Sequence, residues 1–113
     1  SDFEREAREQ GLAEEDVRDA KYAIAALFDE MILNSAWPGK LSWRPLQVEF
    51  FGVHMAGEEF FHRLDALRNA AGSRIEALEI FYICLQLGFE GKYKILGVDK
   101  LKILLEEVGK DIA

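Results

Sequence analysis

The sequence predicts an all-α fold, a small helical bundle of about five helices, and two observations lead to this prediction. Apolar residues recur at steps of three and four over long stretches, which is the period of one face of a helix. No stretch shows the two-residue alternation that is typical of a half-buried strand. Half of the 113 residues are hydrophobic and 12% are aromatic, so the chain has enough apolar material for one packed domain.

The stretch 75–93 is predicted to contain the central helix of this bundle. Its middle has only two clearly polar residues, Glu79 and Gln86, so a helix here is apolar nearly all round and is expected to be buried on most sides. Gly88 follows the last periodic residue, where a left-handed residue ends a helix at low cost. A strand over 80–83 is the rival interpretation, but the apolar run is too long for a typical strand.

The first part of the chain predicts one long helix. Residues 1–10 have the composition of a helix end that stops at Gly11. The acidic residues 14–16 suit the positive end of the next helix, which is predicted to run to about Asn34. This helix carries two apolar stripes, so we expect it to pack on more than one face. The stripes consist of Val17, Ala20, Ile24, Leu27, Phe28 and Met31, and of Tyr22, Ala26 and Leu33.

The segment 35–45 breaks the helical pattern. Its Pro38-Gly39 pair predicts a turn, and Trp37 and Trp43 are expected to pin the loop to the body of the domain. Three further elements are predicted after it, with breaks near the glycines between them. The first is a short helix or turn over 46–51 that is expected to end around Gly52 or Gly57. The others are an amphipathic helix from Gly57 to about Ala70 and a last helix from about Val98 to Val108.

The charge balance narrows the class of partner. Fourteen basic and 21 acidic residues give a net charge of −7. Nucleic-acid binding and anionic membrane surfaces both favour a basic face, so this balance argues against them and favours a protein partner. No apolar run is long enough to span a bilayer and no signal peptide is present, so the chain as given is expected to be soluble.

The sequence offers no convincing catalytic centre. Gly88, Gly91 and Lys92 resemble part of a phosphate-binding loop, but Gln86 stands where a Walker A loop has its first glycine and Tyr93 where it has serine or threonine. The single cysteine, Cys84, lies in the apolar helix with no neighbouring base, so a raised pKa and an inert thiol are expected. We therefore predict no enzyme activity and no cofactor.

A metal-binding helical bundle is the alternative class of function. Glu59 and His62 match the Glu-x-x-His spacing of di-iron bundles, and His54 and Glu58 are the nearest further ligands. A di-iron site requires a second copy of that motif, and Phe51 stands where the glutamate before His54 would be. The interpretation as surface residues without a metal is therefore preferred.

Asp29 and Glu30 are the most informative polar pair. At about 100° per residue Asp29 falls between apolar positions of its helix, among Ala25, Ala26 and Leu33. A carboxylate in such surroundings is either paired with a base or displayed on a surface that a partner covers. A solvated helix face with an internal hydrogen bond is the third interpretation, and the sequence leaves all three open.

Three segments together resemble the DotU/TssL (IcmH/DotU) family. D-A-K-Y-A-I-A-A-L-F-D-E-M-I-L-N-S-A-W at 19–37 is similar to its helix that carries an Asp-Glu pair and leads to a tryptophan turn. F-F-G-V-H-M-A-G-E-E-F-F-H-R-L at 50–64 is similar to its Gly-Glu-x-Phe-Phe segment. L-E-I-F-Y-I-C-L-Q-L-G-F-E-G-K-Y at 78–93 resembles its Leu-Gly-Phe-Glu-Gly-Arg-Tyr signature. The three motifs stand in the family's order and cover roughly residues 17–95.

The resemblance implies a non-enzymatic scaffold of a bacterial type VI secretion system, or its counterpart in type IVB systems. The family domain lies on the cytoplasmic face of the inner membrane, has two small helical bundles in a hook-like arrangement, and is held by one C-terminal transmembrane helix. Its partners are an IcmF/TssM-type membrane protein and baseplate subunits, with a homodimer as an open alternative. Residues 1–113 would then form the cytoplasmic domain without the family's first helices and anchor.

The resemblance also implies roles for particular residues. Asp29 and Glu30 would contribute to an acidic surface for partner docking, with Trp37 and Trp43 as further anchors. The turn after the central helix would be a structural motif rather than a binding loop, formed by Gly88, Phe89, Glu90, Gly91 and Tyr93. A peptide-binding helical module unrelated to secretion is the remaining alternative.

Overall fold

The computed structural model describes residues 2, 5–6, 13–53 and 55–113, and within them the fold is all-α, as predicted. Over these residues it contains six α-helices and one 3-10 helix, and no strand. The α-helices are α2 (Glu14–Leu33), α3 (Leu46–Phe51), α4 (Ala56–Arg68), α5 (Ile75–Gln86), α6 (Tyr93–Leu96) and α7 (Val98–Ile112), and the 3-10 helix is η1 (Pro38–Ser42). The helix end expected at 1–10 falls mostly outside the described residues.

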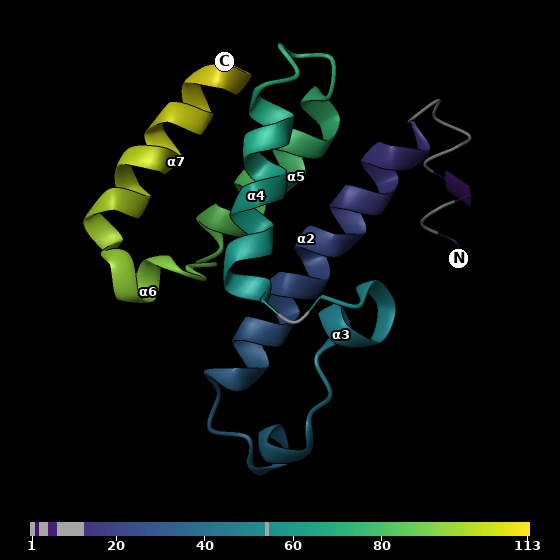
Figure 1. Cartoon of the computed structure of the whole chain (residues 1–113), viewed down its shortest axis with the longest axis vertical. Coiled ribbons are helices and arrows are strands. Elements are labelled where there is room, and N and C mark those ends of the chain that lie inside the picture. Colours follow the sequence, from purple (N-terminus) through teal and green to yellow (C-terminus); the bar gives the residue numbers. More distant parts are fainter. Residues whose placement is uncertain (1, 3–4, 7–12, 54) are drawn as a thin grey trace.

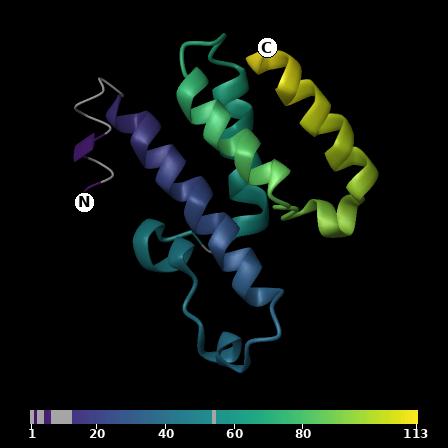
Figure 2. The same cartoon turned by 180° about the vertical axis from the view of Figure 1, so that it is seen from behind.

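Four longer helices form the body, and one end of it carries a projection. Figure 1 shows α4 crossing in front of α5, and Figure 2 shows α5 from behind, between α2 and α7. The segment 34–45 and α3 extend from the lower end of α2, whereas the C-terminal end of α7 lies at the opposite end of the long axis (Figure 1). The body thus separates the projecting segment from the C-terminus.

The prediction that the stretch 75–93 contains the central helix is confirmed. α5 packs against α2, α4 and α7 and contributes Phe81 and Cys84 to the core. It ends where the sequence predicted, because Gly88 takes a φ of 112° and the Phe89 N–H bonds to the Cys84 carbonyl at 3.1 Å. Phe89 then turns back into the core, with its ring centroid 4.2 Å from that of Phe60.

The long helix α2 agrees with its predicted bounds, but its two apolar stripes are only partly buried. Phe28 and Met31, assigned by sequence to the first stripe, are about half exposed, and so is Leu33 of the second. The helices α5, α3 and α4 all pack against α2, yet these outer positions remain about half exposed. Periodicity identified the helix correctly and overstated how much of its surface is buried.

The second half of the chain differs from the prediction in small ways. Gly52 is left-handed and ends α3, as expected, but Gly57 lies inside the first turn of α4 rather than at a break. Its carbonyl accepts a hydrogen bond from the Lys92 N–H at 3.1 Å, and a Cβ at Gly57 would lie 3.2 Å from that nitrogen. Glycine is used here for a close backbone approach. The short helix α6 was expected to be a plain link.

Candidate partner-docking site

Asp29 is buried, and its carboxylate is fully occupied by internal hydrogen bonds. Its side chain is only 2% exposed. Oδ1 accepts from the Trp43 Nε1–H at 3.0 Å and from the Leu46 backbone N–H at 2.7 Å. Oδ2 accepts from the backbone N–H of Gln47 at 3.0 Å and from its side-chain amide at 3.1 Å. Asp29 is therefore neither displayed on the surface nor part of a solvated helix face. Only the internal hydrogen bonding of the third interpretation is present, and it is found in a buried site.

These bonds let Asp29 cap a helix other than its own. Pro45 precedes α3 and supplies no side-chain cap, so the first N–H groups of α3 need an acceptor from elsewhere. The carboxylate of Asp29 accepts two of them and places its negative charge at the positive end of α3. It also binds the indole of Trp43, so one buried group fixes both the end of the loop 35–45 and the start of α3.

A buried polar chain supports Asp29 from the other side. The Tyr22 hydroxyl donates to the Gln47 side-chain oxygen at 2.5 Å, and burial raises the pKa of Tyr22 well above its usual value. The guanidinium of Arg63 lies over the Tyr22 ring at 4.1 Å and pairs with Asp19 at 3.1 Å. Sequence reasoning missed Gln47 and Arg63, because nothing in their spacing distinguishes them from surface residues.

Arg74 continues this polar arrangement at the far end of α2. It bonds to Asp16 and to Asp19, each at 2.6 Å. Burial disfavours the charged guanidinium of Arg74, but its hydrogen bonds with the two carboxylates outweigh that effect, so its pKa is raised. These pairs tie the connection between α4 and α5 to the start of α2.

Glu30, the neighbour of Asp29, holds a different segment. Its two carboxylate oxygens accept the backbone N–H groups of Glu90 at 2.8 Å and Gly91 at 2.9 Å, and the Lys94 ammonium lies 3.5 Å away. Gly91 has a φ of 51°. The turn that the sequence assigned to a structural motif is therefore bound to α2 by the second member of the acidic pair.

Residues 34–45, named here the tip, form the projecting end of the molecule. Trp37 and Trp43 meet edge to face, with ring centroids 6.4 Å apart, and the Trp37 ring covers Gly39 so closely that a side chain there would collide with it. Leu41 is 90% exposed and Trp37 is 51% exposed. The base of the tip is fixed by Asp29, while its end presents apolar side chains to solvent.

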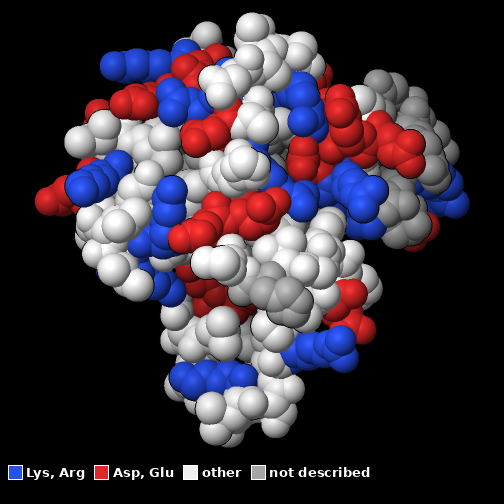
Figure 3. Space-filling model, viewed as in Figure 1, with Lys and Arg blue, Asp and Glu red and all other residues white. Residues whose placement is uncertain are grey.

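The tip is also the least acidic part of the chain. No aspartate or glutamate occurs between Met31 and Val48, whereas Lys40 and Arg44 lie in that interval. Lys40 donates to the Ser35 carbonyl at 2.9 Å, and Arg44 forms an exposed pair with Glu49 at 2.5 Å. Figure 3 shows the lower end of the molecule in white and blue, whereas red is spread over its middle and upper parts. An acidic protein thus carries a cationic and apolar tip.

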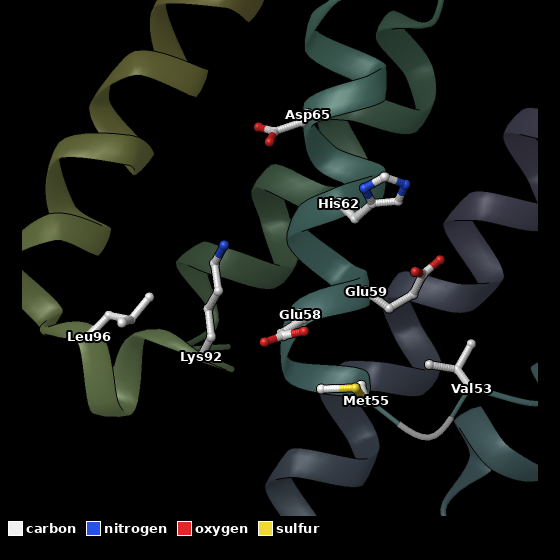
Figure 4. Close-up of a pocket in the computed structure, with 8 residues that line it drawn as sticks. All are labelled: Val53, Met55, Glu58, Glu59, His62, Asp65, Lys92 and Leu96. Atoms are coloured by element: carbon white, nitrogen blue, oxygen red, sulfur yellow. The ribbon is translucent and has the colours of Figure 1, made fainter.

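Three of the four residues considered as metal ligands, Glu58, Glu59 and His62, line one groove beside α4 (Figure 4). Among the described residues no group of three or more His, Cys, Asp or Glu side chains is arranged to hold a metal ion, and His54 lies outside them. Glu59 instead pairs with Arg63 at 2.7 Å. Cys84 is buried, and burial raises the pKa of its thiol to about 11, as the sequence led us to expect.

Comparison with known proteins identifies the family. The family described as type VI secretion system protein DotU matches residues 1–113. The chain belongs to the DotU family. Among solved structures, this DotU chain matches the cytoplasmic domain of TssL from Acinetobacter baumannii with a TM-score of 0.91 and 41% identity, over 97% of this chain and 72% of that one. No curated protein sequence matches it.

Membership makes this DotU chain a structural component of a type VI secretion system, within a family whose members form the membrane complex. None of the helices in the described ranges is long and apolar enough to cross a membrane.

Proposed function

We propose that this DotU-family domain is a non-enzymatic adaptor that docks an IcmF/TssM-type protein and baseplate subunits on the cytoplasmic face of the inner membrane. A type VI system is favoured over a type IVB system because the matching family and the similar structure both carry type VI names. The observation that supports docking most strongly is the tip, where exposed Trp37 and Leu41 stand on a base fixed by Asp29.

Such a tip has the properties of an interface anchor. Binding energy in interfaces concentrates on a few residues, most often Trp, Tyr and Arg, and it is greatest when little conformational entropy is lost on binding. The hydrogen bonds of Asp29 to Trp43 and α3 hold the tip in place before a partner arrives. The four residues expected to bind partners therefore divide into two roles: Trp37 and Trp43 form the tip, and Asp29 and Glu30 position segments.

The location of the tip is compatible with contact to a partner on the cytoplasmic side. It lies at the end of the long axis opposite to the C-terminus of α7 (Figure 1). If a membrane anchor follows the C-terminal end, as the family resemblance implies, the tip points away from the bilayer. A baseplate subunit or the cytoplasmic part of an IcmF/TssM-type protein would meet it there.

The test is a pull-down of partner proteins with a matched pair of variants. Leu41→Asp changes a tip residue that is 90% exposed, and Ile95→Asp makes the same kind of change at a residue that is 92% exposed on α6. Both variants should keep the helical circular dichroism spectrum of the wild type. We expect Leu41→Asp to lose at least about tenfold in partner affinity and Ile95→Asp to bind normally.

Equal binding by both variants would remove the tip from the docking surface. Charge reversal at Asp29 is unsuitable for this purpose, because a buried lysine there would disturb the fold itself.

A further inference from the structure

We propose that the outer edge of the body formed by α6 and α7 rests on the surface of a bilayer that contains anionic lipids. Members of the family form a membrane complex, so a bilayer is within reach of this domain. The contact with lipid is separate from the docking of proteins at the tip. The edge consists of three apolar residues and three lysines: Ile95, Val98, Ile103, Lys100, Lys102 and Lys110.

The apolar side chains of the edge protrude into solvent. Ile95 on α6 is 92% exposed, and Ile103 and Val98 on α7 are 59% and 48% exposed. At about 100° per residue, Ile103 lies on the opposite side of α7 from Leu101, which is buried in the core. Single exposed apolar residues are ordinary, whereas a cluster of them on one edge indicates a surface that contacts a partner or a membrane.

The edge is held firmly to the rest of the body. The Tyr93 ring at the start of α6 meets the Phe61 ring of α4 edge to face, with centroids 4.8 Å apart. Arg68 of α4 binds Asp111 at 2.7 Å and Glu107 at 3.4 Å, both on α7. The protruding side chains are therefore carried by a fixed segment, and little conformational entropy is lost when they make a contact.

The free charges of the edge are mainly positive. Lys100, Lys102 and Lys110 are exposed on α7 and form no ion pair within the described residues. Two of the four acidic residues of α7 are bound by α4, which leaves Asp99 and Glu106. Asp99 lies in the first turn, where the positive end of the helix partly offsets its charge. Lysine stems can lie along an apolar surface while their ammonium groups reach lipid phosphates.

Three neighbouring side chains are turned the other way and do not belong to the edge. Lys94 binds the Asn34 side-chain oxygen at 3.0 Å. Lys92 and Leu96 line the groove beside α4, and Figure 4 shows both pointing into it. The lipid contact therefore depends on Ile95 and on the outward side of α7.

The shape of the edge favours a bilayer over a protein. α7 forms one outer edge of the body, and α2, from which the tip extends, forms the other (Figure 1). A specific protein partner usually covers roughly 800 Å² of each surface with close fit. A bilayer instead accommodates single apolar side chains at the boundary between headgroups and acyl chains. With α7 along the bilayer, the tip stays on the far side of the body and is free to bind.

The overall charge of the chain does not prevent this contact. The net charge of −7 opposes an approach of the whole molecule to an anionic surface. At physiological salt, however, charges farther than about 8 Å from that surface are largely screened. The lysines and apolar side chains of the edge then decide the interaction.

The experiment is co-sedimentation of the whole domain with lipid vesicles at physiological salt. One set of vesicles contains phosphatidylglycerol and phosphatidylcholine in equal parts, and the other contains phosphatidylcholine alone. We expect binding to the anionic vesicles to be at least about tenfold tighter than binding to the neutral ones. Binding to the anionic vesicles should weaken as salt is raised, because the lysines are screened.

A pair of variants with the same net charge locates the contact. Lys100→Gln together with Lys102→Gln lowers the net charge by as much as Arg18→Glu alone, and Arg18 is exposed on α2, the other outer edge. The double lysine variant should lose about tenfold in affinity for the anionic vesicles, since each lysine near such a surface contributes separately. Arg18→Glu should lose less than about twofold, because its charge is screened from the bilayer.

A second pair of variants separates the lipid contact from the docking of proteins. Ile95→Asp removes the most exposed apolar group of the edge and should lose about tenfold in vesicle binding. Leu41→Asp at the tip should bind vesicles as the wild type does. In a pull-down without lipid the two variants should behave in the opposite way. Circular dichroism checks that each variant is folded, and Ile95→Ser replaces Ile95→Asp if it is not.

Three outcomes would overturn the proposal: a wild type that does not bind anionic vesicles, equal binding to both kinds of vesicle, or equal losses in the double lysine variant and in Arg18→Glu. Each would mean that the edge serves an acidic protein or no partner. Normal partner binding together with any of them would leave the adaptor function standing. Vesicle binding without partner binding would refute the adaptor function alone.

Discussion

Asp29 and Glu30 are adjacent acidic residues on one helix, yet they hold two different regions of the molecule. Asp29 is buried and accepts four hydrogen bonds from residues 43–47, at the base of the tip. Glu30 is partly exposed and accepts two, from the backbone of the turn after α5. The residue type is nearly the same, and the difference lies in how completely each carboxylate is removed from water.

This difference sets the expected cost of removing each side chain. Donors left without an acceptor in a buried site lose their hydrogen bonds without gaining water, whereas donors near the surface are rehydrated. The Asp29 region should therefore be much more sensitive to substitution than the Glu30 region. The predictions below test this ordering, from the largest expected effect to the smallest.

Asp29→Ala should cost about 4 kcal/mol of unfolding free energy, because it leaves the indole of Trp43 and three N–H groups of Leu46 and Gln47 without their charged acceptor. Urea unfolding followed by circular dichroism measures the loss. Leu41→Ala at the exposed end of the tip is the control and should stay within about 0.5 kcal/mol of the wild type. A loss below about 1 kcal/mol for Asp29→Ala would mean that water replaces the carboxylate.

Gly91→Ala tests the turn held by Glu30 and should cost about 3 kcal/mol. Its φ is 51°, and an added Cβ would lie 2.9 Å from the Phe61 ring and 3.0 Å from the Gly57 carbonyl oxygen. Gly72→Ala is the matched control, because it has a φ of 85° but nothing within 4 Å of the added atom. Equal losses for the two variants would show that backbone conformation alone, and not packing, requires glycine at Gly91.

The core beneath that turn should lose stability at alkaline pH. Burial raises the folded-state pKa of the Cys84 thiol from its ordinary value of 9.0 to about 11, so the protonated thiol contributes stability below about pH 9 that is lost as the pH rises toward 11. The loss should be about 2 kcal/mol, and the raised pKa of Tyr22 acts in the same direction. Urea unfolding between pH 8 and 10.5 measures it.

If the thiol causes this loss, the free energy of unfolding of Cys84→Ala should fall less steeply with pH than that of the wild type. An unchanged slope would mean that other groups cause the loss.

Glu30→Gln should have the smallest effect, about 1 kcal/mol, because the amide keeps one acceptor oxygen and the side chain is partly exposed. The Lys94 ammonium would lose its ionic partner at 3.5 Å. Thermal unfolding at low and high salt measures the difference, which should shrink as salt rises. A loss as large as that of Asp29→Ala would contradict the ranking of the two sites.

The sequence predicted the helices well because their signals are local. Gly88 and Gly52 marked helix ends, and the positive φ that each adopts is favoured by glycine itself, without help from distant residues. Gly57 was wrongly expected to break a helix because its role is not local. It depends on the approach of the Lys92 backbone, which lies 35 positions later in the chain. The burial of Phe28 and Met31 likewise depends on which helices pack beside them, and both side chains are about half exposed.

The candidate site was predicted only in part. Periodicity placed Asp29 among apolar residues, which correctly singled it out, but it could not show that the donors of residues 43–47 would surround it. The cationic character of the tip was visible in the sequence as an acid-free interval, and the overall charge of −7 concealed it. The candidate site therefore depends on long-range hydrogen bonds and on the local distribution of charge, and neither can be predicted from the overall composition.

The central claim is that each carboxylate holds its own segment, and residue-specific amide hydrogen exchange tests it most directly. In Asp29→Asn, exchange at Leu46 and Gln47 should accelerate while Glu90 and Gly91 keep their wild-type rates. In Glu30→Gln the pattern should be reversed. Faster exchange of both segments in both variants, or of neither, would contradict the account.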